Sequence, residues 1–230
     1  MKRNSSIWFA GVGVAVALGM SNAQALEISF DFNNPEQTTE ISQTGTLGLF
    51  DTALGTLTSV SLELIGSATT TITLTSEAAQ AQTVSATSQV NLFFDESALG
   101  ADLGIPDPAL VLEISTGFET LLPGDSATFG PESDNDELAL LYDLSNPLLD
   151  VFKADGGGSF DLGCNSLTGL NVVGGGGNVI ASQQTIAGCG AKITYEYEPG
   201  DITVPTPGTL ALLALGLIAG GGIHRRRRAA

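Results

Sequence analysis

Cys164 and Cys189 are the only thiols of the chain and could form either a disulfide or a redox-active pair. They lie far apart in the sequence, and no C-x-x-C motif of the kind that tunes a reactive thiol is present. An isolated pair of this kind usually becomes a structural disulfide once a protein leaves the cytoplasm. The bond would close a loop that holds the flexible glycines 174–177, and it would remove about 3.5 kcal/mol of entropy from the unfolded chain. We therefore predict a Cys164–Cys189 disulfide.

A second candidate site is the run of oxygen ligands at Asp134, Asp136 and Glu137, with Asn135 between them and Glu132 nearby. Ca²⁺ prefers such hard oxygen ligands. The spacing differs from that of an EF-hand loop, and no glycine stands at the position of its sharp turn. Two interpretations stay open, a calcium site with these residues as ligands or a solvated acidic loop.

Residues 26–204 contain neither histidine nor arginine, which limits their chemistry. This excludes Ser-His-Asp and Cys-His nucleophiles, histidine-bound zinc and a guanidinium clamp for phosphate. The region holds all 25 acidic residues and only two basic ones, Lys153 and Lys192, so its net charge is −23. Repulsion therefore excludes nucleic acid and anionic lipid as partners, whereas divalent cations and neutral or cationic polymers are favoured.

Carboxylates are the groups left for catalysis, and they act only where burial or pairing separates their pKa values. Residues 49–53, Leu-Phe-Asp-Thr-Ala, are close to the aspartic-protease pattern, but alanine replaces its glycine and no second copy follows. The acids offer many glycosidase-type pairs, and no spacing singles one out. Tyr195 and Tyr197 share one face of a strand and could stack on sugars if exposed, although a core position is favoured. We expect a protein that is not an enzyme.

Segments in which polar and apolar residues alternate dominate residues 26–199 and predict an all-β fold, an antiparallel β-sandwich. Gly66-Ser67 predicts a turn between two of its strands. No proline interrupts residues 36–105, so this region is expected to supply the central strands. Expected inward residues are Val60, Leu62, Leu64, Val84, Ala86, Val90 and Leu92. The expected strands are 26–32, 50–65, 69–76, 82–94, 109–115, 138–144, 159–162, 179–186 and 191–197.

Residues 1–25 have the order of a secretory signal peptide. Lys2 and Arg3 precede an apolar run over 7–20, and Ala23 and Ala25 are the small residues that a signal peptidase reads. The alternative is a membrane anchor, but the run is short for a span that needs roughly 20 apolar residues. We predict an N-terminal signal helix, recognised by signal peptidase and cleaved after Ala25, and hence an exported protein.

The other end of the chain has prolines that would end the preceding strand, then an apolar segment that predicts a helix, and finally a cluster of arginines. Residues 200–209 form a Pro-containing linker with a sorting motif, and residues 210–230 form a hydrophobic helix with an Arg-rich tail. A helix over 210–223 would rise about 21 Å against roughly 30 Å of hydrocarbon, which suits transient rather than permanent membrane insertion. The arginines are expected to stay cytoplasmic. The candidate sorting residues are Val204, Pro205, Thr206, Pro207, Arg225, Arg226, Arg227 and Arg228.

This tail resembles the PEP-CTERM sorting signal of Gram-negative bacteria, with Thr206 in place of the central glutamate of that motif. The resemblance implies handling by an exosortase, a membrane transpeptidase that would remove the helix. The protein would then associate transiently with the inner membrane before it reaches the cell surface or the extracellular space. A plain tail anchor is the alternative.

Residues 50–67, from Phe50-Asp51 through Gly66-Ser67, resemble the opening of the choice-of-anchor E domain, and residues 193–199 resemble its last strand. That family implies no established activity, cofactor or catalytic residue. The sequence thus predicts an exported surface or extracellular-matrix protein with a structural or adhesive role. A module that binds Ca²⁺ or exopolysaccharide is the alternative, and a carboxylate-based glycan-active enzyme is a less favoured one.

Overall fold

Strict alternation of buried and solvent-facing residues runs through the long strands of the computed structural model, which describes residues 25–200. Strand β5 (Gly55–Ser76) has 22 residues and β12 (Val179–Pro199) has 21. Every second residue of β5 is buried from Val60 to Ser76. Since side chains of a strand alternate between its two faces, one whole face of β5 lies in the core.

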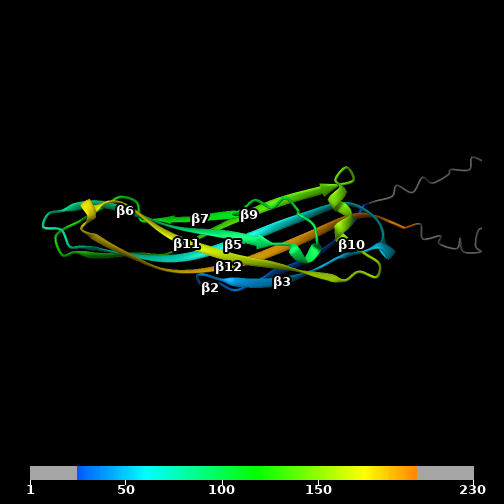
Figure 1. Ribbon diagram of the computed structural model, residues 1–230, viewed down its shortest axis with the longest axis horizontal. Helices are drawn as coiled ribbons and strands as arrows, with labels where there is room; N and C mark the ends of the chain where they lie inside the picture. Colours follow the sequence, from blue (N-terminus) through cyan, green and yellow to red (C-terminus); the bar gives the residue numbers. More distant parts are fainter. Residues whose placement is uncertain (1–24, 201–230) are drawn as a thin grey trace, which may run out of the picture.

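Two antiparallel sheets pack face to face and form an elongated sandwich (Figure 1). The first sheet has the order β1-β12-β5-β9, with β2 beside β12, and the second has the order β3-β11-β6-β7, with β8 beside β6. The remaining strands are β1 (Leu26–Asn33), β2 (Gln37–Thr38), β3 (Ser42–Gly48), β6 (Gln82–Asp95), β7 (Leu110–Ser115), β8 (Glu119–Leu121), β9 (Ser126–Asp143) and β11 (Ser159–Gly174). Strands β4 (Phe50–Asp51) and β10 (Lys153–Ala154) pair in parallel, and the 3₁₀ helices are η1 (Thr52–Leu54), η2 (Ser97–Leu99), η3 (Pro147–Phe152) and η4 (Gly175–Gly177).

The predicted all-β architecture is confirmed for the described residues. Strands β5 and β6, which come from the proline-free region, each have neighbours on both sides. All the expected inward residues of these two strands are buried, none more than 1% exposed. The alternation of apolar and polar residues was sufficient to predict these inward positions, because one face of each strand contacts the core and the other faces outward.

The predicted turn at Gly66-Ser67 is wrong, because both residues lie inside β5. Gly66 faces the core, where a Cβ atom would come within 2.5 Å of Leu92 Cδ1 and 2.9 Å of Leu110 Cδ1. Glycine therefore permits close packing between the sheets at this position rather than a reversal of the chain. The strands expected at 179–186 and 191–197 are likewise one continuous strand, β12.

Both ends of the described chain lie at the same end of the sandwich (Figure 1). Strand β1 pairs with β12 so that Leu26 is opposite Tyr197. The other end carries the β11–β12 connection, with η4 at its tip (Figure 1). The sandwich thus has one end that holds both ends of the described chain, and a far end that is formed by connections between strands.

A polar layer divides the interior into two apolar clusters. The larger cluster lies toward the chain ends and includes Ala68 and Val90, and the smaller lies toward the far end and includes Ile72 and Ala86. Between them are Thr70, Ser88 and Thr185, each at most 5% exposed. The Thr70 hydroxyl lies 3.0 Å from that of Thr185 and 3.4 Å from that of Ser88.

The predicted Cys164–Cys189 disulfide is confirmed. It joins β11 of one sheet to β12 of the other, and both cysteines are 1% exposed. The bond lies in the larger apolar cluster, and the loop that it closes is the β11–β12 connection with its glycines.

The predicted signal helix and sorting helix lie outside the described residues. This applies to Ala23 and to all the sorting residues, Val204, Pro205, Thr206, Pro207, Arg225, Arg226, Arg227 and Arg228. Ala25 is described and is exposed directly before β1. Between residues 25 and 200, no helix has the length and apolar character needed to cross a membrane.

Candidate functional site

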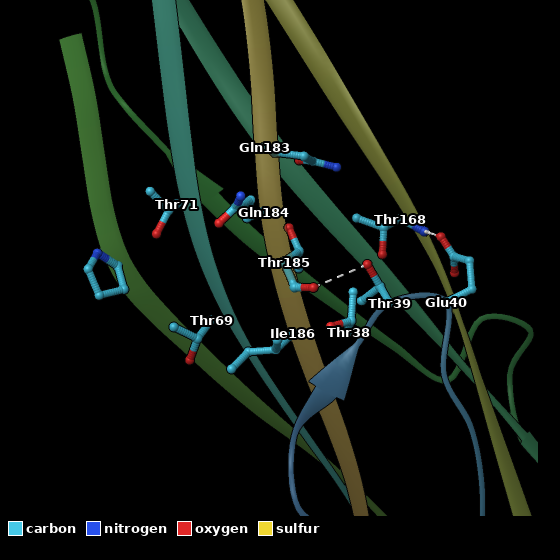
Figure 2. Close-up of a pocket in the computed structure, with 11 residues that line it drawn as sticks. Thr38, Thr39, Glu40, Thr69, Thr71, Thr168, Gln183, Gln184, Thr185 and Ile186 are labelled. Carbon is cyan, nitrogen blue, oxygen red and sulfur yellow. Dashed lines mark hydrogen bonds between the residues drawn. The ribbon is translucent and has the colours of Figure 1, made fainter.

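An open groove of about 680 Å³ lies where the turn between β2 and β3 ends against β11 and β12 (Figure 2). Its lining is dominated by hydroxyl and amide side chains: Thr38, Thr39, Glu40, Thr69, Thr71, Pro131, Thr168, Gln183, Gln184, Thr185 and Ile186. Thr69 and Thr71 lie on one side of β12, and Thr39, Glu40 and Thr168 lie on the other (Figure 2). The groove therefore crosses β12 from the edge of the sandwich onto its outer face.

The groove exists because the short strands β1, β2 and β3 cover only half the length of β11 and β12. Strand β2 pairs with β12 only at Ile186 and Ala187, and β3 pairs with β11 only as far as Asn165. In the described part of the chain, no strand continues along this side of β11 and β12 toward the far end. The ends of β2 and β3 form a step beside the unpaired parts of β11 and β12, and the groove lies at this step.

Glu40 closes the edge of β11 at this step. One of its carboxylate oxygens accepts a hydrogen bond from the Thr168 N–H at 2.8 Å, and the other accepts one from the Ser166 hydroxyl at 3.2 Å. The Ser166 oxygen in turn accepts a hydrogen bond from the Ile41 N–H at 2.9 Å. The carboxylate thus takes the place of a neighbouring strand, and each of its oxygens accepts one hydrogen bond.

Two buried polar atoms of the groove have no hydrogen-bond partner among residues 25–200. They are the hydroxyl oxygen of Thr168 and the side-chain carbonyl oxygen of Gln183. Leaving such an atom buried and unpaired costs about 1–3 kcal/mol. Thr185 of the polar layer also lines the groove, so a band of side-chain polar groups runs from the centre of the core to the surface here.

The acidic run that could form a calcium site belongs to strand β9 rather than to a loop, which corrects the interpretation as a solvated loop. The structure places Asp134 in a cleft with Glu113 and Glu132, and this cleft does not include Asp136 or Glu137. Asp134 accepts hydrogen bonds from the Glu113 N–H at 2.9 Å and from the Asn135 N–H at 3.0 Å. Asp136 and Glu137 are consecutive in a strand, so their side chains point to opposite faces. Among the described residues, no group of three or more acidic, cysteine or histidine side chains is arranged to hold a metal ion.

The Phe50-Asp51 pair has structural contacts. Asp51 accepts hydrogen bonds from the Ala53 N–H at 2.9 Å and the Gly156 N–H at 3.0 Å, which fixes the start of η1. Phe50 is buried, with its ring centre 5.9 Å from that of Tyr195 and 5.3 Å from that of Tyr197. Tyr195 is fully buried and donates a hydrogen bond to the Gly48 carbonyl at 2.7 Å, which confirms the preference for a core position at this residue.

The groove was not predicted from the sequence because its residues come from five distant segments and none has distinctive chemistry alone. A signal was nevertheless present. Thr70 and Ser88 occupy inward positions of β5 and β6, where the alternation calls for apolar residues. Departures from the local pattern of a fold are expected at functional sites.

No protein-family model matches the chain, and no curated protein matches it. Solved structures that it resembles are those titled infectious bursal disease virus Gx strain (11% identity, 91% of this chain, TM-score 0.17) and infectious bursal virus derived T=1 particles (10%, 88%, 0.19). The chain covers 55% and 50% of these two chains, about half their length. Likenesses of this size carry no inference about function.

Proposed function

We propose that this chain is an exported bacterial surface or extracellular-matrix protein, sorted by an exosortase, with a structural or adhesive role and no catalytic step. The observation that carries the proposal is that both ends of the described chain lie at one end of an elongated sandwich (Figure 1). A domain tethered through residues that follow Pro199 would hold its far end away from the point of attachment. That arrangement suits a protein that presents the far end of its sandwich at the cell surface or in the matrix.

Two further features support the proposal. The buried disulfide between the sheets is of a kind that persists outside the reducing cytoplasm. The net charge of −23 on residues 26–204 keeps copies apart and favours cations and neutral polymers as partners. The PEP-CTERM resemblance of the tail supplies the proposed route.

The route is tested by the intact mass of the protein from its native host. We expect loss of residues 1–25 and of everything after about Pro207. A matched variant, with Pro205→Ala and Pro207→Ala, should keep the signal-peptide cleavage and lose the second one. Recovery of native protein with Arg225–Arg228 in washed membranes would instead mean a plain tail anchor.

Display is tested separately with an epitope tag inserted at Ala79, an exposed residue of the β5–β6 connection. Antibody should label the tag on intact cells or in the shed matrix. Labelling only after the cells are permeabilised would contradict surface display even if the tail is cleaved.

A further inference from the structure

We propose that the groove between the β2–β3 turn and strands β11 and β12 binds an uncharged segment of a polysaccharide. The proposal deepens the adhesive role proposed above and rests on it for biological meaning. Binding to the groove in solution can nevertheless be measured without any assumption about export or sorting.

Two polar atoms of the groove lack a hydrogen-bond partner among the described residues. The Thr168 hydroxyl and the Gln183 side-chain carbonyl are buried without a partner in the described chain, and both line the groove. Thr185 on the groove wall continues inward to Thr70 and Ser88, so the fold interrupts its apolar core to bring polar groups to this place. Both unpaired atoms are closed to solvent, so a sugar hydroxyl would supply the missing hydrogen bond once the Thr168 or Gln183 side chain rotates toward the groove.

The chemistry of the lining selects the ligand. Threonine hydroxyls and glutamine amides both donate and accept hydrogen bonds, as the hydroxyls of a sugar do. Among residues 25–200, the only charged residue of the lining is Glu40, and its two oxygens accept hydrogen bonds from Thr168 and Ser166. In the described part of the chain no lysine lines the groove, so an anionic ligand would meet an acidic surface without a counter-charge from these residues. A cation would find a single carboxylate that is already engaged.

The shape of the groove favours a chain rather than a single sugar. It is open along the surface and crosses β12, from Thr168 and Glu40 on one side to Thr69 and Thr71 on the other (Figure 2). An internal segment of a polymer can lie in such a groove with both ends in solvent. The described residues place no aromatic ring in the groove lining, so they offer no stacking on sugar rings and each site should be weak, with a Kd of about 1 mM. A matrix with many copies would raise the avidity.

The test is an NMR titration of the disulfide-bonded protein as it is purified from its host, whichever ends of the chain it retains. Neutral probes are cellohexaose, maltohexaose and N-acetylchitohexaose, and the acidic probe is hexamannuronate. At least one neutral probe should shift the resonances of Thr168, Gln183 and Thr39, and hexamannuronate should shift none of them.

Two variants remove the unpaired atoms, Thr168→Val and Gln183→Leu, and each should weaken binding about tenfold or more while the unfolding midpoint stays equal or rises. The matched control is Thr120→Val, on β8 at the opposite side of the sandwich, which should leave binding unchanged. The proposal is overturned if no neutral probe shifts groove resonances, if the acidic probe binds equally well, or if both groove variants bind like the control. Loss of groove binding with intact tail processing would refute this site and leave the proposed sorting untouched.

Discussion

Cys164 and Cys189 are bonded across the interior of the sandwich, with their Cα atoms 6.5 Å apart. Cys164 lies opposite Gln43 and Phe94 within its own sheet, and Cys189 lies opposite Gly66 in the other. The Gln43 side-chain oxygen accepts a hydrogen bond from the Cys189 N–H at 3.1 Å, which makes a second link between the sheets beside the disulfide. The disulfide therefore fixes the register of one sheet against the other.

Removing this bond should lower the free energy of unfolding. The double variant Cys164→Ala/Cys189→Ala frees a loop whose closure is worth about 3.5 kcal/mol in the chain-entropy model. Urea unfolding of the variant and the parent protein measures the loss. Alkylation of native parent protein without reductant should label neither cysteine, and rapid labelling of both would contradict the disulfide in the exported protein.

The sequence predicted those parts of the fold in which one face of a strand contacts the core along its whole length and the other face points outward. Val84 and Leu92 of β6 were placed correctly because the strand alternates without a break. The length of the strands was not predicted. Gly66 read as a turn because glycine commonly marks one, whereas here it removes a side chain that would collide with Leu92. Such a collision depends on the packing of two sheets and has no local signature.

The groove could not be predicted for a related reason. Glu40, Thr168 and Gln183 belong to separate segments, and each is an ordinary polar residue of a β protein. Only the pairing of β2 with β12 and of β3 with β11 brings them to one step. The acidic run at Asp134–Glu137 suggests a shared site because its residues are adjacent in sequence, but neighbouring residues of a strand point to opposite faces.

The close packing at Gly66 predicts a large effect from one methyl group. Gly66→Ala places a Cβ atom 2.5 Å from Leu92 Cδ1 and 2.9 Å from Leu110 Cδ1, so these buried side chains must repack, and we expect destabilisation by about 2 kcal/mol. Gly169→Ala on β11 is the matched control, because its Cβ meets no atom within 4 Å. Urea unfolding should show the loss for the first variant alone. Equal stabilities of the two variants would contradict close packing at Gly66.

Divalent cations should stabilise the protein through its acidic surface. The carboxylates of the described residues repel one another, and weak Ca²⁺ binding spread over this acidic surface would relieve the repulsion without a preformed metal site. Millimolar Ca²⁺ should raise the thermal midpoint more than NaCl at equal ionic strength. Equal shifts in the two salts would reduce the effect to screening and remove calcium as a partner.

Alkaline pH should destabilise the fold through Tyr142. Its hydroxyl donates a hydrogen bond to the Leu103 carbonyl at 2.9 Å, and burial, followed by the nearby Glu96 and Asp102 charges, raises the pKa of Tyr142 to about 12. An unfolded tyrosine has a pKa of about 10, so the unfolded state loses its proton first. The contribution of Tyr142 to the free energy of unfolding is complete below about pH 10. It falls as pH rises from about 10 toward 12, by at most about 1.4 kcal/mol per pH unit.

The check on this pH dependence is urea unfolding between pH 9 and pH 11.5, a range set by the free tyrosine pKa of about 10. Tyr142→Phe should flatten the slope and cost about 1 kcal/mol at neutral pH through the lost hydrogen bond. Tyr195, whose pKa burial also raises, should supply the slope that remains. An unchanged slope in the variant would contradict a buried, protonated Tyr142.

The polar layer between the two apolar clusters should be a cost to stability rather than a source of it. In Thr185→Val, Thr70 keeps only the 3.4 Å contact with Ser88, so its hydroxyl is nearly unpaired in the core. We expect the free energy of unfolding to fall by about 1–2 kcal/mol.

In the triple variant Thr70→Val/Ser88→Ala/Thr185→Val, no hydroxyl of the layer remains to be paired, and the two apolar clusters can join. Its stability should equal or exceed that of the parent protein, because exchanging all partners for apolar groups of similar shape avoids the desolvation cost. Urea unfolding of the three single variants and the triple variant measures this non-additivity. If the triple variant loses as much as the single variants summed, the layer stabilises the fold in its own right, and its continuation into the groove would need no ligand to account for it.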